Sequence, residues 1–198
     1  MSESTMIEQE LDITFGKYND PSLRDMPAKM IEQLNQLSQM INKDPEHVIP
    51  GLTELVEKYN IPVLSNLLYA AYNMNNESDK AENVALDSYK NFPDYLFAKV
   101  NYAHVCLLKG DLDKIEHIFS NKFDLRTLYP QRKKFHISEF ISFSGITCLF
   151  FYEKGALKKA KEILDSLEKI VPDDQMTKIL KQKLNTSFIT KLITKVFK

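Results

Sequence analysis

Residues 62–95 read PVLSNLLYAAYNMNNESDKAENVALDSYKNFPDY, and this stretch decides the fold. It has the form of two helices joined by a turn, with Pro93 near its end. The pattern restarts without a gap at residues 96–119, LFAKVNYAHVCLLKGDLDKIEHIF, and again at residues 141–174, ISFSGITCLFFYEKGALKKAKEILDSLEKIVPDD. Self-similarity at such a period indicates a repeat architecture in which each copy is one supersecondary unit.

The three copies align when Pro62, Leu96 and Ile141 are each counted as position 1. Close contacts between the two helices of a unit are expected at positions 8 and 20, which hold Tyr69, Ala103, Cys148, Ala81, Ile115 and Ala160. The turn between the helices is expected at position 15, which holds residues that tolerate a positive φ at a helix end, namely Asn76, Gly110 and Gly155.

In length, punctuation and these positions the copies resemble the tetratricopeptide repeat (TPR) family, a 34-residue helix–turn–helix repeat. The resemblance implies an all-α solenoid of antiparallel helix pairs in a right-handed superhelix. Its expected domain covers residues 26–174, with units at residues 28–61, 62–95, 96–129 and 141–174. In the first unit a helix is predicted from Pro27 and a second from about Pro50, which suits a first-turn position.

The two ends of the chain differ in charge from each other. Residues 1–25 are acidic and are expected either to be partly disordered or to pack elsewhere on the array. Residues 175–198 predict a basic amphipathic helix that caps the last repeat, the alternative being a weak membrane contact through residues 178–198. The opposite charges favour docking of the two ends within one chain or head-to-tail self-association between chains, the second of which would give a homo-oligomer.

Composition restricts the class of protein. The chain has 198 residues, a net charge of −1, 43% hydrophobic residues and 27% charged residues, which predicts one globular domain with no general attraction to nucleic acid. Cys106 and Cys148 lie far apart in apolar runs and are expected to be buried thiols. With neither a signal peptide nor an apolar run of about 18 residues, a cytoplasmic location is expected.

Extra residues between the second and third copies carry a cationic loop. A short helical turn at residues 125–129, a loop and a long helix capped by Ser138 are expected there. An anionic partner could meet the side chains of Arg126, Arg132, Lys133, Lys134 and His136, although a solvated charge run is the alternative.

The layout of this region is similar to helical repeat regions of bacterial proteins that can end in a SEC-C zinc motif. That motif needs clustered cysteines near the C-terminus, and no cysteine follows Cys148. No metal site is therefore expected.

The TPR resemblance implies a concave groove lined by the first helices of successive units. Residues at the groove positions, largely apolar, are expected to bind a peptide or a partner helix: Asn66, Phe97, Val100, Asn101, His104, Leu149 and Tyr152. Only Asn101 matches the carboxylate clamp of TPR co-chaperones, so chaperone C-termini are not the expected ligand.

Catalytic signatures are missing from the sequence, which has no Gly-rich phosphate loop, no His-Glu-x-x-His pattern and no G-x-S-x-G elbow. The sequence therefore predicts a non-enzymatic protein-interaction module without a cofactor. The alternative is a small chaperone dedicated to one client, resembling the TPR chaperones of bacterial secretion systems.

Overall fold

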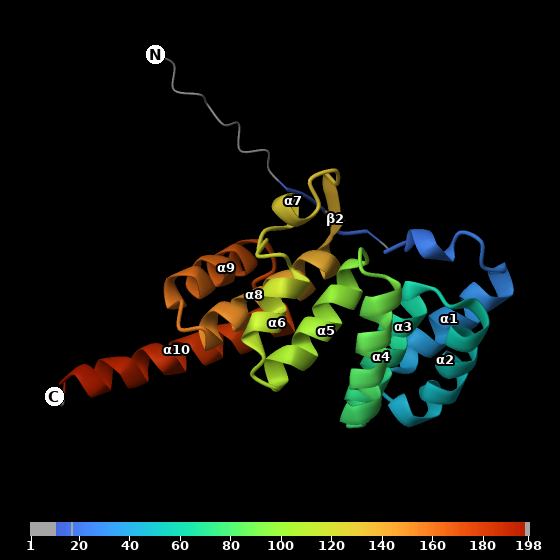
Figure 1. The fold of residues 1–198 in the computed structure, drawn as a ribbon, viewed down its shortest axis with the longest axis horizontal. Helices are drawn as coiled ribbons and strands as arrows, with labels where there is room; N and C mark the ends of the chain where they lie inside the picture. The colour runs from blue at the N-terminus through green and yellow to red at the C-terminus, as the bar shows by residue number, and fades with distance from the viewer. Residues whose placement is uncertain (1–10, 17, 197–198) are drawn as a thin grey trace, which may run out of the picture.

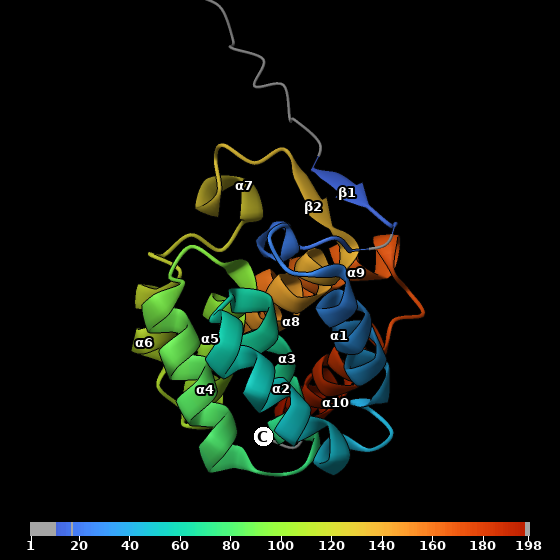
Figure 2. The same ribbon diagram turned by 90° about the vertical axis from the view of Figure 1, so that its right-hand side faces the viewer.

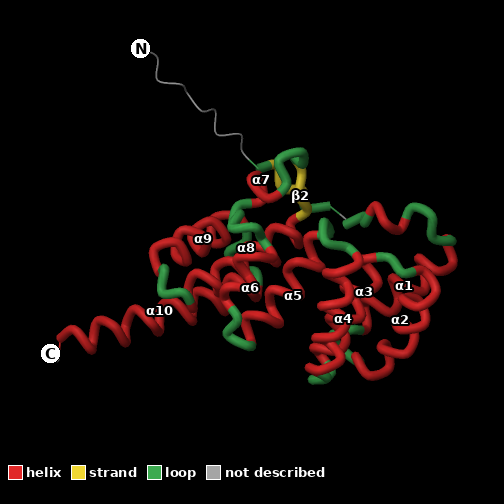
Figure 3. Tube along the Cα trace, in the orientation of Figure 1, coloured by secondary structure: helices red, strands yellow, loops and turns green. Residues whose placement is uncertain are grey.

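The computed structural model describes residues 11–16 and 18–196, with side-chain environments as far as Thr186. Within these residues the protein is all-α apart from two strands of three residues each. Helices follow one another along the long axis of the molecule (Figures 1 and 3), and consecutive helices pack together from α1 to α6 and again from α8 to α10. The predicted all-α class is therefore confirmed.

Four helices fill the first half of the chain: α1 (Ala28–Met40), α2 (Pro45–Tyr59), α3 (Pro62–Met74) and α4 (Ser78–Asn91). The predicted start of α2 near Pro50 is wrong, because the helix begins at Pro45. Asp44 caps it there by accepting a hydrogen bond from the backbone N–H of His47 at 3.2 Å. Proline suits the first turn, where its missing N–H leaves no bond unmade.

The second half holds α5 (Leu96–Leu108), α6 (Leu112–Ile118), α7 (Leu125–Leu128), α8 (Ile137–Glu153), α9 (Leu157–Ile170) and α10 (Gln175–Val196). Helix α6 is short because the chain leaves the helical region directly after it. Ser120 and Asn121 have φ values of 51° and 58°, which a continuing right-handed helix cannot accommodate. The helical turn expected at residues 125–129 corresponds to α7.

The inter-helix turns confirm the predicted backbone conformation at position 15. Asn76, Gly110 and Gly155 have φ values of 58°, 72° and 77°. A β-carbon is strained in this region, so glycine or asparagine is favoured at each of the three turns. The same local device thus ends α3, α5 and α8.

The residues expected at close helix contacts are buried. Ala103, Cys148, Ile115 and Ala160 are each fully buried, and Ala81 is 2% exposed. The Cys148 thiol donates to the carbonyl oxygen of Ala160 at 3.2 Å, so α8 and α9 approach closely at this point. Burial also raises the pKa of Cys148 to about 12, which keeps its sulfur protonated.

Two hydrophobic clusters form most of the core. One lies among α1, α2 and α3, with Val48, Leu52 and Leu64 fully buried. The other runs from α5 through α10, with Phe119 and Phe150 fully buried.

Helix α10 belongs to the second cluster and packs on α8 and α9. Leu180 and Leu184 are buried, whereas the neighbouring Ile179 is 49% exposed. The side chains of Phe188, Leu192 and Val196 lie outside the described residues. None of the helices among the described residues is long and apolar enough to cross a membrane.

The N-terminal segment, residues 11–16 and 18–25, lies beside the stretch that precedes α8 (Figure 2). Its strand β1 (Asp12–Thr14) pairs in parallel with β2 (Lys134–His136), with Ile13 opposite Phe135. A single 3-10 turn, η1 (Pro21–Leu23), follows, and Asp20 caps it. The described part of this segment is thus attached to residues more than a hundred positions away.

Candidate binding cleft

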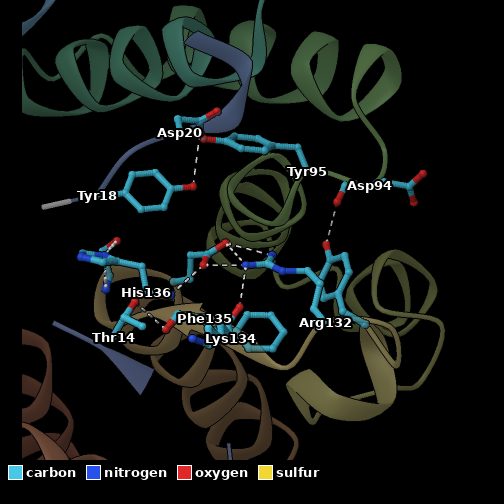
Figure 4. A network of polar contacts seen from close by, with 12 residues as sticks. Thr14, Tyr18, Asp20, Asp94, Tyr95, Arg132, Lys134, Phe135 and His136 are labelled. Carbon is cyan, nitrogen blue, oxygen red and sulfur yellow. Dashed lines mark hydrogen bonds and ion pairs between the residues drawn. The ribbon is translucent and has the colours of Figure 1, made fainter. Parts of the chain in front are cut away.

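A cleft of about 810 Å³ opens where three separate parts of the chain meet (Figure 4). The N-terminal segment, the α4–α5 turn and the β2–α8 junction supply its walls. The lining combines aromatic rings, prolines and charged groups, and includes Tyr18, Asp20, Pro62, Phe92, Pro93, Asp94, Tyr95, Arg132, Lys134, Phe135, His136 and Glu139.

Asp20 is a buried carboxylate at the centre of one wall, only 6% exposed. Its Oδ2 accepts hydrogen bonds from the hydroxyls of Tyr95 at 2.7 Å and Tyr18 at 3.2 Å. Its Oδ1 accepts bonds from the backbone N–H and the hydroxyl of Ser22, at 2.9 and 2.5 Å. Four donors compensate the buried charge, and two of them come from the residue that follows Pro21 in η1.

The tyrosine hydroxyls beside Asp20 remain donors at neutral pH. Burial, and next the nearby Asp20 carboxylate, raises the pKa of both Tyr18 and Tyr95 above the ordinary tyrosine value. Neither hydroxyl is therefore prepared to act as a base or a nucleophile. Their chemistry in the cleft is hydrogen-bond donation to an acceptor.

Glu139 is the second buried carboxylate, with a side chain 5% exposed. Arg132 binds it with both terminal nitrogens, the closest contact being Nη2 to Oε2 at 2.9 Å. The guanidinium also lies over the ring of Phe135, 4.2 Å from its centroid. A bidentate pair stacked on an aromatic ring fixes the Arg132 side chain on the cleft wall.

His136 occupies the N-cap of α8 and joins this helix to the N-terminal segment. The backbone N–H of Ser138 donates to its Nδ1 at 3.2 Å, while Glu139 accepts from the His136 backbone N–H at 2.9 Å. Because Nδ1 is an acceptor here, Nε2 carries the proton and donates to the carbonyl oxygen of Gly16 at 2.7 Å. The expected cap at Ser138 is wrong, because α8 begins one residue after His136.

The cationic loop residues line two cavities, and several of them have carboxylate partners. Arg132, Lys134 and His136 line the cleft. A smaller cavity of about 390 Å³ is lined by Arg126 and Lys133, and by Arg132 and Lys134 as well. Arg126 pairs with Asp124 at 3.1 Å, and Lys134 lies 3.7 Å from Asp12. Much of the predicted positive patch is thus neutralised by neighbouring acids.

Three predicted groove residues are buried in the free chain: Phe97, Val100 and Asn101 are 7–8% exposed. The ring of Phe97 meets the ring of Tyr18 at 5.9 Å, so the N-terminal segment covers it. Neither Phe97 nor any other predicted groove residue lines the cleft.

A polar connection between α3 and α5 brings together three of the predicted groove residues. The Asn101 amide donates to Oδ1 of Asn66 at 2.9 Å. One turn further along, the Tyr69 hydroxyl lies 2.7 Å from Nδ1 of His104. Burial lowers the pKa of His104 and raises that of Tyr69 to about 12, so both are neutral at pH 7 and the Tyr69 hydroxyl donates.

The remaining groove residues, Leu149 and Tyr152, lie on α8 and are half-buried. The ammonium group of Lys183 on α10 lies 4.9 Å from the centroid of the Tyr152 ring. Tyr152 therefore contacts the C-terminal helix rather than the α3–α5 connection.

Asp20, Tyr95 and Glu139 were not identified from the sequence as site residues. A local signal was present for two of them. Asp20-Pro21-Ser22 has the form of a capping residue before a proline at the first helical position, and His136 with Glu139 has the spacing of a capping box. For Tyr95 no local signal exists, since its partner lies 75 positions away.

Among the described side chains, no group of three or more His, Cys, Asp or Glu residues is placed to hold a metal ion. Comparison with models of protein families, with curated proteins and with solved structures gave no match to the chain. The resemblance to TPR proteins consequently stays a prediction.

Proposed function

We propose that this protein is a cytoplasmic, non-enzymatic interaction module, built as a TPR-like solenoid, that binds a peptide segment of a partner protein. The binding site is the cleft between the N-terminal segment, the α4–α5 turn and the β2–α8 junction. This replaces the apolar groove expected on α3, α5 and α8, because Phe97 and Val100 are buried.

One observation carries the proposal: the helical array already holds an extended stretch of polypeptide at the rim of the cleft. Strand β1 pairs with β2, and His136 Nε2 donates to the Gly16 carbonyl. The adjoining cleft, at about 810 Å³, is in the size range of ligand pockets. Its rings, prolines and fixed donors supply contact area and hydrogen bonds suited to a second stretch of peptide.

The test begins with purification of the tagged chain from its source organism and mass spectrometry of what binds. A single stoichiometric client would favour the dedicated-chaperone alternative, and several partners would favour a scaffold. The affinity of a recovered partner is then measured for Lys134→Glu and Lys133→Glu. The two variants make the same change of charge at adjacent positions. They differ because Lys134 lines the cleft and Lys133 does not.

The expected result is that Lys134→Glu changes the affinity at least fivefold while Lys133→Glu leaves it within twofold, in keeping with the strength of a single charge contact at an interface. Equal effects of the two variants would remove the cleft as the binding site. Turnover of a small molecule by the purified chain would remove the non-enzymatic assignment.

A further inference from the structure

The side chains of the N-terminal segment are less deeply buried than those of the core. Within its described residues, 11–16 and 18–25, Asp20 is the only buried residue. Ile13 and Tyr18 are half-buried, and Phe15 is 65% exposed. Backbone pairing, polar contacts and the partly buried side chains of Leu11, Ile13 and Leu23 at the edges of the core clusters therefore hold the segment. A ladder of three residue pairs is marginal by itself, which makes this attachment reversible.

The surface beneath the segment presents a set of groups that each recognise one chemical feature. The edge of β2 pairs with an extended backbone, and His136 Nε2 binds a carbonyl oxygen. The rings of His136 and Phe97 lie 5.0 and 5.9 Å from the ring of Tyr18. The Tyr95 hydroxyl binds the carboxylate of Asp20. Together these groups select an extended chain with an aromatic residue two positions before an acid.

We infer that this surface is a peptide-binding site in its own right, and that residues 12–16 and 18–22 occupy it as an exchangeable ligand in cis. The external ligand is an extended segment of a partner protein with the pattern aromatic-x-Asp or aromatic-x-Glu. This inference rests on the proposed function, because the partner segment enters at the rim of the same cleft. It adds the partner chemistry and a mode of regulation, since the cis segment must leave before the partner binds.

Competition between the two ligands sets the apparent affinity. A segment joined by a short linker has an effective concentration of the order of millimolar. A peptide added in trans must compete with this effective concentration of the cis segment, so the wild-type chain binds the added peptide weakly. Changes that loosen the cis segment without touching the surface beneath it are expected to strengthen binding of the added peptide.

The experiment uses the full chain and a fluorescent peptide with the sequence of residues 11–24, LDITFGKYNDPSLR. Fluorescence anisotropy measures its Kd for the wild type and for the double variant Tyr18→Ala with Asp20→Ala. We expect the double variant to bind at least tenfold more tightly, because the cis segment loses its ring and its carboxylate. Phe15→Ala is the matched control: it changes an exposed residue of the same segment, and its Kd should equal that of the wild type.

A second set of measurements tests the surface itself. Tyr95→Phe, added to the loosened chain, should weaken binding about tenfold by removing the donor to the peptide carboxylate. A peptide in which Ala replaces the residues corresponding to Tyr18 and Asp20 should bind each variant no more tightly than it binds the wild-type chain. Circular dichroism establishes that each variant keeps its helix content.

Equal Kd values for the wild-type and loosened chains would overturn the inference. A dimer of the loosened chain that excess peptide does not dissociate would assign the surface to a second copy and overturn the partner-peptide assignment. The probe here is the protein's own sequence, whereas the proposed function is tested with Lys134→Glu and a recovered partner. Failure of one experiment therefore does not imply failure of the other.

Discussion

The hydroxyl of Tyr95 donates to Oδ2 of Asp20 at 2.7 Å and so joins the start of α5 to the N-terminal segment. Asp20 is 6% exposed and accepts from three residues in all. A buried carboxylate depends on such donors, because they replace the hydrogen bonds to water that it loses on burial. The Asp20 carboxylate thus connects the end of the segment near η1 to the start of α5.

Removing the Tyr95 hydroxyl tests this dependence. Tyr95→Phe should lower the free energy of unfolding by about 1.5 kcal/mol, the usual contribution of a hydrogen bond to a charged group. Urea denaturation measures the change. Tyr102→Phe is the matched control: it removes a hydroxyl from the same helix, and its ring, stacked on Tyr89 at 5.2 Å, remains in place. Equal effects of the two variants would contradict a specific role for the Asp20 contact.

The pair of Arg132 and Glu139 makes a second prediction. Arg132→Ala leaves the Glu139 carboxylate buried without its cation, which should cost about 2 kcal/mol; the figure is below that of a fully buried pair because the Arg132 side chain is 39% exposed. The double variant Arg132→Ala with Glu139→Gln should recover part of this loss, since no unpaired charge remains. Chemical denaturation of both variants gives the comparison. A double variant less stable than Arg132→Ala would contradict an electrostatic origin.

Local signals in the sequence account for much of the fold. Asn76, Gly110 and Gly155 identified three turns because a positive φ restricts residue type at that position. Ala81 and Ala160 marked close helix contacts because only small side chains fit there. Each of these signals lies within one helix pair.

The candidate cleft was less accessible to sequence reasoning because its walls come from distant positions. The pairing of Ile13 with Phe135 joins short strands that carry no periodic signal of their own. Phe97 was assigned to an open groove since its place in the repeat does not reveal that Tyr18 covers it. The cationic loop was identified, but the acid opposite Arg132 was not assigned to it.

Overpacking tests the close contacts between paired helices. Ala81→Leu and Ala160→Leu should each destabilise the protein by about 1–3 kcal/mol, because both positions are at most 2% exposed and the neighbouring backbone must move. Ala28→Leu, at the exposed start of α1, is the control and should change stability by less than about 0.5 kcal/mol. Neutral results at both buried positions in urea melts would show that the helix register is wrong.

The His104–Tyr69 contact predicts a pH dependence of stability. Burial lowers the pKa of His104 in the folded protein, so the unfolded chain binds a proton more readily. The stability contributed by the neutral His104 side chain is fully present above the ordinary histidine pKa of about 6.5. It is lost as the pH falls through the pKa of His104 in the folded protein. Stability of the wild type should therefore fall more steeply from pH 7 to pH 5 than that of His104→Gln. Parallel curves for the two proteins in denaturant titrations would contradict this.

Phe97 separates packing from ligand contact more directly than any other residue. Its ring is 7% exposed and lies 5.7 Å from the ring of Tyr95 and 5.9 Å from that of Tyr18. Phe97→Ala should therefore cost about 3 kcal/mol or more and lower Tm by about 6 °C or more in a chain of this size. Leu108→Ala on the same helix, 72% exposed, should leave Tm nearly unchanged. An open groove predicts the opposite result for Phe97→Ala, namely an unchanged Tm with loss of partner binding. Calorimetry together with an affinity measurement distinguishes the two, because removal of the ring lowers Tm in the absence of a ligand only if the ring is buried.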